Sequence, residues 1–201
     1  MALFTNTNQT DLAAIQTLAA DICAVSSTFT TNGKLSVNIE IIHAKDNASA
    51  SVGAGTKYTV EQYIGGDWRP VVGAFVQAGI TAPTAMVTDG IENAGQTVIE
   101  CGAVVPAIDD IICFKNANIL LTEFKRVVAR VTTGGSETVT IKDALTNQQA
   151  QGTYYTQVEM FNIKLDLKGI IQLRVHANNN LGTTNRAVIW QVSFITCDSI
   201  G

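Results

Sequence analysis

Regular alternation of apolar and polar residues near the end of the chain constrains the fold more than any other feature. Apolar residues occupy every second position over 163–167, 171–175 and 188–194, and polar or charged residues fill most positions between them. A period of two points successive side chains to opposite faces of a sheet. The turn-rich segment 178–185 separates the last two stretches. The sequence therefore predicts a half-buried β-meander.

The same pattern recurs earlier in the chain, over 35–42, 57–64 and 120–132. An Asn-Gly pair at 32–33 is a hairpin signal when strands flank it, and Gly65-Gly66 predicts a second turn. Roughly eight to ten strands spaced by turns favour a sandwich or barrel. We expect a mainly β fold, an antiparallel sandwich or jelly-roll-like barrel, with an immunoglobulin-like sandwich as the other topology.

One helix is predicted near the start of the chain. Apolar residues recur there at three- and four-residue spacing, and Thr10 and Asp11 suit the N-terminus of a helix. The apolar positions are Leu12, Ile15, Leu18, Ala19 and Ile22. Such a helix would lay an apolar stripe on the sheet or on a neighbouring subunit.

A length of 201 residues fits one β domain, which we expect to span 1–201. Residues 1–30 are predicted to form an N-terminal arm and helix. Residues 66–118 hold all three prolines and only short apolar runs, so they are predicted to form an irregular insertion within the domain. A long loop inside a compact domain usually serves function or assembly.

The charge composition favours protein contact over nucleic-acid binding. Charged residues make up 15% of the chain, against about 25% in an average domain, and such surfaces suit interface cores. The net charge of −4 does not favour binding to nucleic acid, which is itself negatively charged. Residues 1–114 hold four basic and eleven acidic groups, or −7, and the remainder carries +3. Such a division can favour head-to-tail contact between copies, although charge splits of this size also arise by chance.

The chain is expected to fold in a reducing host cytoplasm, away from membranes. Its start lacks a basic region and a long apolar run, so no signal peptide is predicted. The uncharged stretch 70–86 contains two prolines and several polar residues, which excludes a spanning helix. The four cysteines are far apart and have apolar neighbours, so they are predicted to be buried free thiols. They are Cys23, Cys101, Cys113 and Cys197.

No set of residues predicts an enzyme. His43 and His176 are the only histidines, and no G-x-S-x-G serine accompanies them. Two histidines and scattered cysteines do not make a zinc site, and the acidic turn 89–93 lacks the ligand spacing of a calcium loop. Neither a catalytic residue, nor a metal, nor a cofactor is predicted. Three arginines could form a cluster, but salt bridges to Asp and Glu fit them better; they are Arg126, Arg130 and Arg174.

Contact surfaces remain as the candidate site. Isoleucines on several strands occupy faces that should otherwise be polar, and apolar residues recur in the uncharged segment. Exposed apolar residues of this kind mark interfaces. The predicted interface residues are Trp68, Val72, Phe75, Val76, Ile80, Met86, Ile42, Ile189 and Ile195.

The chain as a whole resembles the small structural proteins of tailed-bacteriophage particles, which include capsid decoration, neck and tail components. The features shared are the short polar start 1–8, the Thr/Asn/Ala/Gly-rich sheet, and the uncharged stretch 70–88. The resemblance implies a virion protein that forms symmetric homo-oligomers and contacts other virion proteins. It assigns no functional residue.

A binding module is the alternative prediction. Trp68 and Tyr63 could form an aromatic platform for carbohydrate or a host surface, with amide groups supplied by the loop 178–185.

Overall fold

The protein is mainly β and divides into two compact units. The computed structural model describes residues 10–12, 16–18, 22–31, 33–45, 55–78, 85–88, 90–102, 105–133, 136–150, 153–155, 158–179 and 188–197. The first unit comprises residues 1–43, 52–80 and 160–201, and the second comprises 44–51 and 81–159. The second unit is thus built from two segments inserted into the first.

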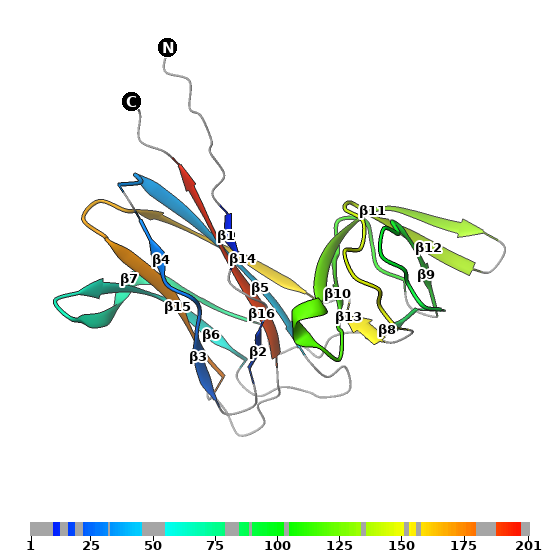
Figure 1. Ribbon diagram of the computed structural model, residues 1–201, viewed down its shortest axis with the longest axis horizontal. Helices are drawn as coiled ribbons and strands as arrows, with labels where there is room; N and C mark the ends of the chain where they lie inside the picture. Colours follow the sequence, from blue (N-terminus) through cyan, green and yellow to red (C-terminus); the bar gives the residue numbers. More distant parts are fainter. Residues whose placement is uncertain are drawn as a thin grey trace, which may run out of the picture. The chain divides into compact units, whose positions relative to one another are not determined.

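Two antiparallel sheets form the first unit (Figure 1). One sheet has the order β1-β16-β5-β14, with β2 also paired to β16. The other has the order β3-β15-β6-β7, with β4 also paired to β15. The strands are β1 (Thr10–Leu12), β2 (Gln16–Leu18), β3 (Cys23–Val25), β4 (Phe29–Thr30), β5 (Ser36–Lys45), β6 (Lys57–Ile64), β7 (Asp67–Gln77), β14 (Glu159–Asp166), β15 (Gln172–Asn178) and β16 (Val188–Cys197).

The alternation in the sequence becomes alternation of burial. In β15, Leu173, Val175 and Ala177 are buried and the residues between them are half-buried. Residues from both sheets share one apolar cluster, so the sheets face each other across it. Phe29 and Phe194 stack with their ring centroids 5.0 Å apart, one ring from each sheet. This cluster is the hydrophobic core of a β-sandwich.

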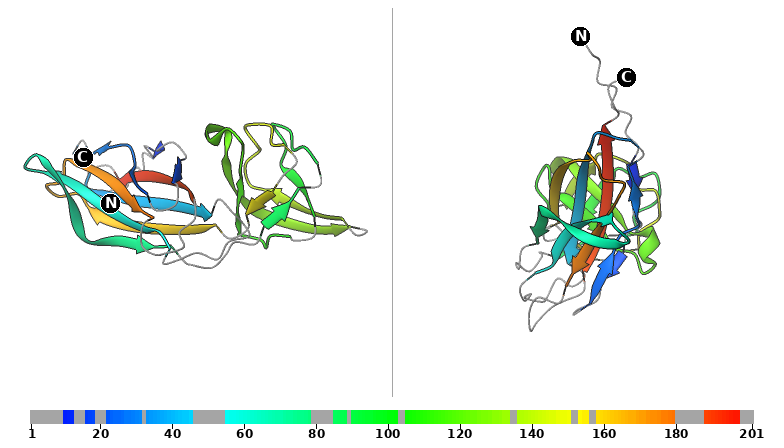
Figure 2. Two further views of the ribbon diagram at one scale, coloured as in Figure 1. Left: turned by 90° about the horizontal axis from the view of Figure 1, so that it is seen from below. Right: turned by 90° about the vertical axis from the view of Figure 1, so that its left-hand side faces the viewer.

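The second unit is one six-stranded sheet with the order β8-β13-β10-β11-β12-β9. Its edges meet, because Thr88, directly after β8, pairs with Cys101 at the end of β9. The sheet therefore curls on itself (Figure 2). Its elements are β8 (Ala85–Val87), β9 (Val98–Cys101), β10 (Ile111–Phe114), the 3-10 helix η1 (Ile119–Leu121), β11 (Glu123–Thr133), β12 (Ser136–Ile141) and β13 (Thr153–Tyr155).

A buried polar network accompanies the smaller core of the second unit. The Glu123 carboxylate accepts hydrogen bonds from the backbone N–H of Thr146 at 2.9 Å and of Asn147 at 2.8 Å. The Lys125 ammonium lies 2.9 Å from the same carboxylate. Burial raises the pKa of Glu123, but these N–H groups and the ammonium outweigh it, so the pKa lies below the usual range. The network fixes the segment after β12 against β11.

The structure does not show the predicted N-terminal helix. The described residues of that stretch, 10–12 and 16–18, are strands β1 and β2, and both pair with β16. Apolar residues spaced for a helix face also suit two short strands, so long-range pairing decided the outcome.

Two predictions about connections have different outcomes. Gly65 and Gly66, both with positive φ, form the two-residue turn of the β6–β7 hairpin, as predicted. The turn at Gly33 also has a positive φ but makes no hairpin, because β4 and β5 belong to different sheets.

The insertion also differs from its prediction. Residues 66–118 were expected to be irregular within a single domain. Instead β7 is part of the first unit, and the second unit extends to residue 159.

Candidate functional site

A bulge in the edge strand β7 exposes apolar residues. Thr59 pairs with Phe75 and Glu61 pairs with Pro70, so the four residues 71–74 lie opposite the single residue 60. Gly73 supports this bulge with a φ of 75°. The Val72 side chain is 99% exposed and that of Phe75 is 55% exposed. Pro70 and the bulge remove regular edge hydrogen bonds, so β7 offers side chains for contact more than its backbone.

Aromatic and charged side chains are ordered beside the bulge. The Arg174 guanidinium lies 4.3 Å from the centroid of the Trp68 ring. Glu61 holds this guanidinium with a 2.7 Å ion pair from Nε to Oε2. On the other side, Trp68 contacts Tyr63, with ring centroids 5.3 Å apart. The four side chains form a preorganised patch, since each is held by a neighbour.

The same face continues toward the other end of β6. The Lys57 ammonium lies 4.7 Å from the centroid of the Phe75 ring. Lys57, Tyr63, Trp68, Val72, Phe75 and Arg174 are named here the hairpin surface. Its mixture of aromatic, aliphatic and cationic groups is typical of protein interfaces.

The predicted interface residues fall into different environments. Val72 and Phe75 are exposed, and Trp68 is half-buried on the same hairpin. Val76 is half-buried and packs against the core, so it is mainly a core residue. Ile80 lies outside the described residues. Met86 lies on β8 of the second unit, and its side chain is outside the described set.

The three isoleucines are less exposed than predicted. Ile42 and Ile195 are half-buried. The expected exposure of Ile189 is wrong, because its side chain is 0% exposed and this chain already covers it.

The two histidines lie on different sheets of the first unit, His43 on β5 and His176 on β15. His43 is buried, and its Nδ1 lies 2.6 Å from the Tyr58 hydroxyl. His176 is half-buried on β15 in register with Thr59 and Val25. Within the described ranges, no three His, Cys, Asp or Glu side chains could hold a metal ion. Nor does any described helix have the length and apolarity needed to cross a membrane.

The arginines pair with carboxylates, as predicted. Arg126 lies 3.7 Å from Asp109, and Arg130 lies 2.6 Å from Glu137. Arg126 and Arg130 both lie on β11, whereas Arg174 lies on β15 of the other unit and is bound by Glu61, so the three arginines do not belong to one sheet.

The cysteine prediction holds in part. Cys101 and Cys113 are buried and form no disulfide, whereas Cys23 is exposed because it lies on the outer side of β3. The side chain of Cys197 lies outside the described set.

Sequence reasoning missed two features of the hairpin surface: the position of Arg174 and the β7 bulge. Arg174 and Glu61 are 113 positions apart and meet only because β15 and β6 pair. The β7 bulge had one local signal, Gly73 within an otherwise apolar strand.

Comparisons with protein-family models and with curated proteins found no match to this chain.

Proposed function

We propose that this protein is a structural component of a bacteriophage particle, which oligomerises through the hairpin surface and stabilises a capsid or tail assembly. Its partners would be further copies of itself and other virion proteins, and its place would be the virion. The observation that carries the proposal is an exposed apolar bulge beside an ordered aromatic and arginine patch, on the edge strand of a β-sandwich.

The strand order supports this proposal by analogy. When β1/β2 and β3/β4 are each counted as one strand, the first unit has eight strands, in the sheet orders 1-8-3-6 and 2-7-4-5. These orders correspond to a jelly roll, an architecture used by viral capsid proteins and also by lectins. The longer segment of the second unit is inserted between the fifth and sixth strands. Fold analogy alone does not assign function, so the proposal depends on the hairpin surface.

The chemistry of the surface fits a protein partner. Burying the apolar Val72 and Phe75 side chains yields about 25 cal/mol per Å² of apolar area removed from water. The Arg174 guanidinium is already positioned by Glu61 and Trp68, so little side-chain entropy is lost when it contacts a partner. Rigid aromatic and arginine anchors of this kind are enriched among binding hot spots.

A double substitution tests the proposal. Val72→Asp with Phe75→Asp places charges at the exposed bulge without removing core contacts. We expect light scattering after size exclusion to give a smaller mass than that of the wild type, with the β circular dichroism unchanged. Point variants are preferable to deletion of 70–88, because Asp67–Gln77 is an integral strand.

Leu120→Asp is the matched control, since Leu120 is 68% exposed but lies in the second unit. It should keep the mass of the wild type. Retention of full assembly by the Val72/Phe75 variant would exclude the hairpin surface as the contact.

A carbohydrate-binding module remains the second candidate, because Tyr63 and Trp68 form an aromatic pair on an exposed hairpin. The Arg174 guanidinium already covers one face of the Trp68 ring, which leaves less of it for a sugar. Most of the loop 178–185 lies outside the described residues. Glycan-array binding that Trp68→Ala abolishes would support this candidate, and an array without signal would exclude the tested glycans.

A further inference from the structure

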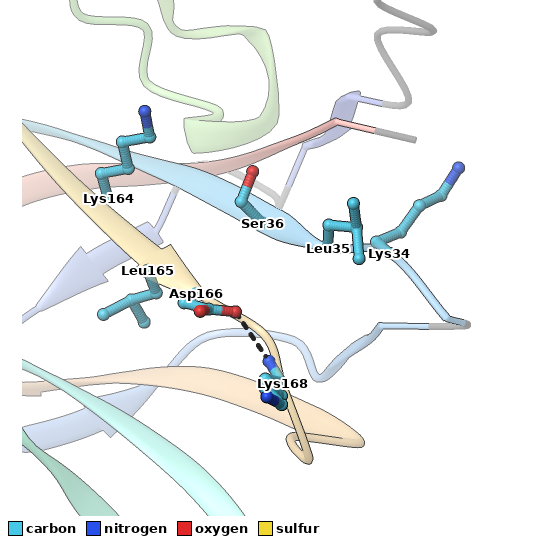
Figure 3. A pocket seen from close by; sticks show the side chains of 7 residues that line it. All are labelled: Lys34, Leu35, Ser36, Lys164, Leu165, Asp166 and Lys168. Atoms are coloured by element: carbon cyan, nitrogen blue, oxygen red, sulfur yellow. Dashed lines mark hydrogen bonds between the residues drawn. The ribbon is translucent and has the colours of Figure 1, made fainter. Parts of the chain in front are cut away.

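A lysine-rich cavity lies at the end of the first unit where β14 leads into β15. It has a volume of about 670 Å³ and lies where β14 ends and β5 begins. An adjoining cavity of about 540 Å³ shares Lys34 and Lys168 with it. Both volumes fall in the usual range of binding pockets. Figure 3 shows Lys34, Ser36 and Lys164 extending to one side of the two strands. The joined space is named here the lysine cavity.

The lysine cavity is cationic and partly apolar. The lining includes Lys34, Lys164 and Lys168 and a single carboxylate, Asp166, which sum to a formal charge of +2. One Asp166 oxygen accepts the Lys168 backbone N–H at 3.0 Å (Figure 3). The first unit as a whole has seven basic and seven acidic residues, a net charge of zero. Apolar side chains complete the lining; they are Leu35, Leu165, Leu167, Ile170 and Ile171.

The second unit carries a turn with complementary chemistry. The turn 107–110 is closed by the Asp110 carboxylate, which accepts the Ala107 N–H at 2.8 Å. Ile108 is 56% exposed at this turn, and the Asp109 side chain is 80% exposed. Asp109 has a φ of 75°, a left-handed conformation that Asp tolerates better than most residues. This acidic turn presents an isoleucine and two carboxylates together.

We propose that the acidic turn of one copy docks in the lysine cavity of the next copy. The inference rests on the proposed function, since it specifies a second contact of the same assembly. The two carboxylates of the turn carry −2, of which Arg126 offsets one charge at 3.7 Å from Asp109, so the turn remains opposite in sign to the +2 of the cavity, and the exposed isoleucine matches the apolar lining. The second unit has six basic and ten acidic residues, a net charge of −4. This negative charge attracts the second unit of one copy toward the lysine cavity of another.

The contact would be heterologous, because it joins two different surfaces. Heterologous contacts repeat from copy to copy, and they close into a ring or extend as a filament. Rings and tubes are the forms expected of a neck or tail component, so the contact sharpens the proposed function.

Zero-length cross-linking tests the contact directly. A carbodiimide joins carboxylates to amines that touch, and a mixture of nitrogen-14 and nitrogen-15 protein identifies links between different copies. We expect Asp109 of one copy to link to Lys164 or Lys168 of another. The result that overturns the inference is an absence of these mixed-isotope links while other carboxylate–amine links form.

Charge reversal gives a second test. Lys164→Glu with Lys168→Glu changes the cavity from +2 to −2, and Ala107→Lys with Asp109→Lys changes the turn from −2 to +1. Each variant alone places like charges together, so we expect its self-association to weaken at least about tenfold. Mixing the two variants should restore association. Lys115→Glu, outside both surfaces, is the control that should leave association unchanged.

The outcomes separate this inference from the proposed function. If both charge variants keep the wild-type mass while the Val72/Phe75 variant dissociates, the docking contact is wrong and the assembly role stands. If the wild type is monomeric but mixed-isotope links between Asp109 and the cavity lysines form, the docking contact holds and stable self-assembly is wrong. Thermal melting of each variant should match the wild type, and restored association on mixing shows that both variants are folded.

Discussion

The two units of this chain are stabilised by different interactions. The first unit buries a large apolar cluster between two sheets, and its described ion pair between Arg174 and Glu61 lies on the outer side of a sheet. The second unit has a smaller apolar cluster and places a charged group, Glu123, among buried hydrogen bonds. A sandwich core depends mainly on apolar area, whereas a small curled sheet also needs its loops bound by polar contacts. The units should therefore respond differently to cavities and to pH.

The largest effect is expected from a cavity in the first unit. Phe194→Ala removes a ring that is 1% exposed and stacked on Phe29. We expect the free energy of unfolding to fall by about 3–5 kcal/mol, measured by urea titration with circular dichroism. Val71→Ala, at a half-buried position of the bulge, should cost clearly less. If both variants lost the same free energy of unfolding, Phe194 would not be a central residue of the core.

The second largest effect is expected from the polar network. Glu123→Gln removes the charge that Thr146, Asn147 and Lys125 bind, and it should destabilise the protein by about 1–3 kcal/mol at pH 7. The folded pKa of Glu123 lies below its unfolded value, so its contribution is present above the unfolded pKa and is lost as pH falls through the folded pKa. The stability difference between wild type and variant should therefore shrink from pH 7 to pH 3. A difference independent of pH would show that the charge plays no part.

A smaller effect is expected at the hairpin surface. Arg174→Lys keeps the positive charge but loses the planar stacking on Trp68. We expect a loss of about 0.5–1 kcal/mol in stability, together with weaker self-association in sedimentation experiments. Unchanged association would indicate that the stacked guanidinium does not touch the partner.

The smallest effect is expected at Glu92, and its sign is opposite to that of Glu123. Burial raises the pKa of Glu92, repulsion from Glu100 adds to it, and a hydrogen bond from the Glu100 N–H acts in the other direction. The folded pKa therefore exceeds the unfolded value, which costs stability above the folded pKa and none at low pH. Glu92→Gln should slightly raise the melting temperature at pH 7 and leave it unchanged near pH 3. A lower melting temperature at pH 7 would contradict this assignment.

The two units also differ in how much of them the sequence predicts. Strands such as β15 follow from local alternation, because one face of each strand meets the core. Leu12 and Leu18 suggested a helix since their spacing fits both a helix face and two short strands, and pairing with β16 decided between them. Glu123 binds Thr146 and Asn147, which follow it in the sequence by 23 and 24 positions. No local sequence pattern predicts such a contact. Of the candidate site, Trp68, Val72 and Phe75 were predicted, whereas the contribution of Arg174 required the sheet topology.

The proposed role of the hairpin surface is to join copies of this protein into an assembly. Light scattering after size exclusion, over a concentration series of wild type and of the Val72→Asp/Phe75→Asp variant, tests it most directly. We predict a discrete multiple of 21.4 kDa for the wild type and a smaller mass for the variant, whose hairpin contact is lost. A wild type that remains at 21.4 kDa at every concentration would contradict this role.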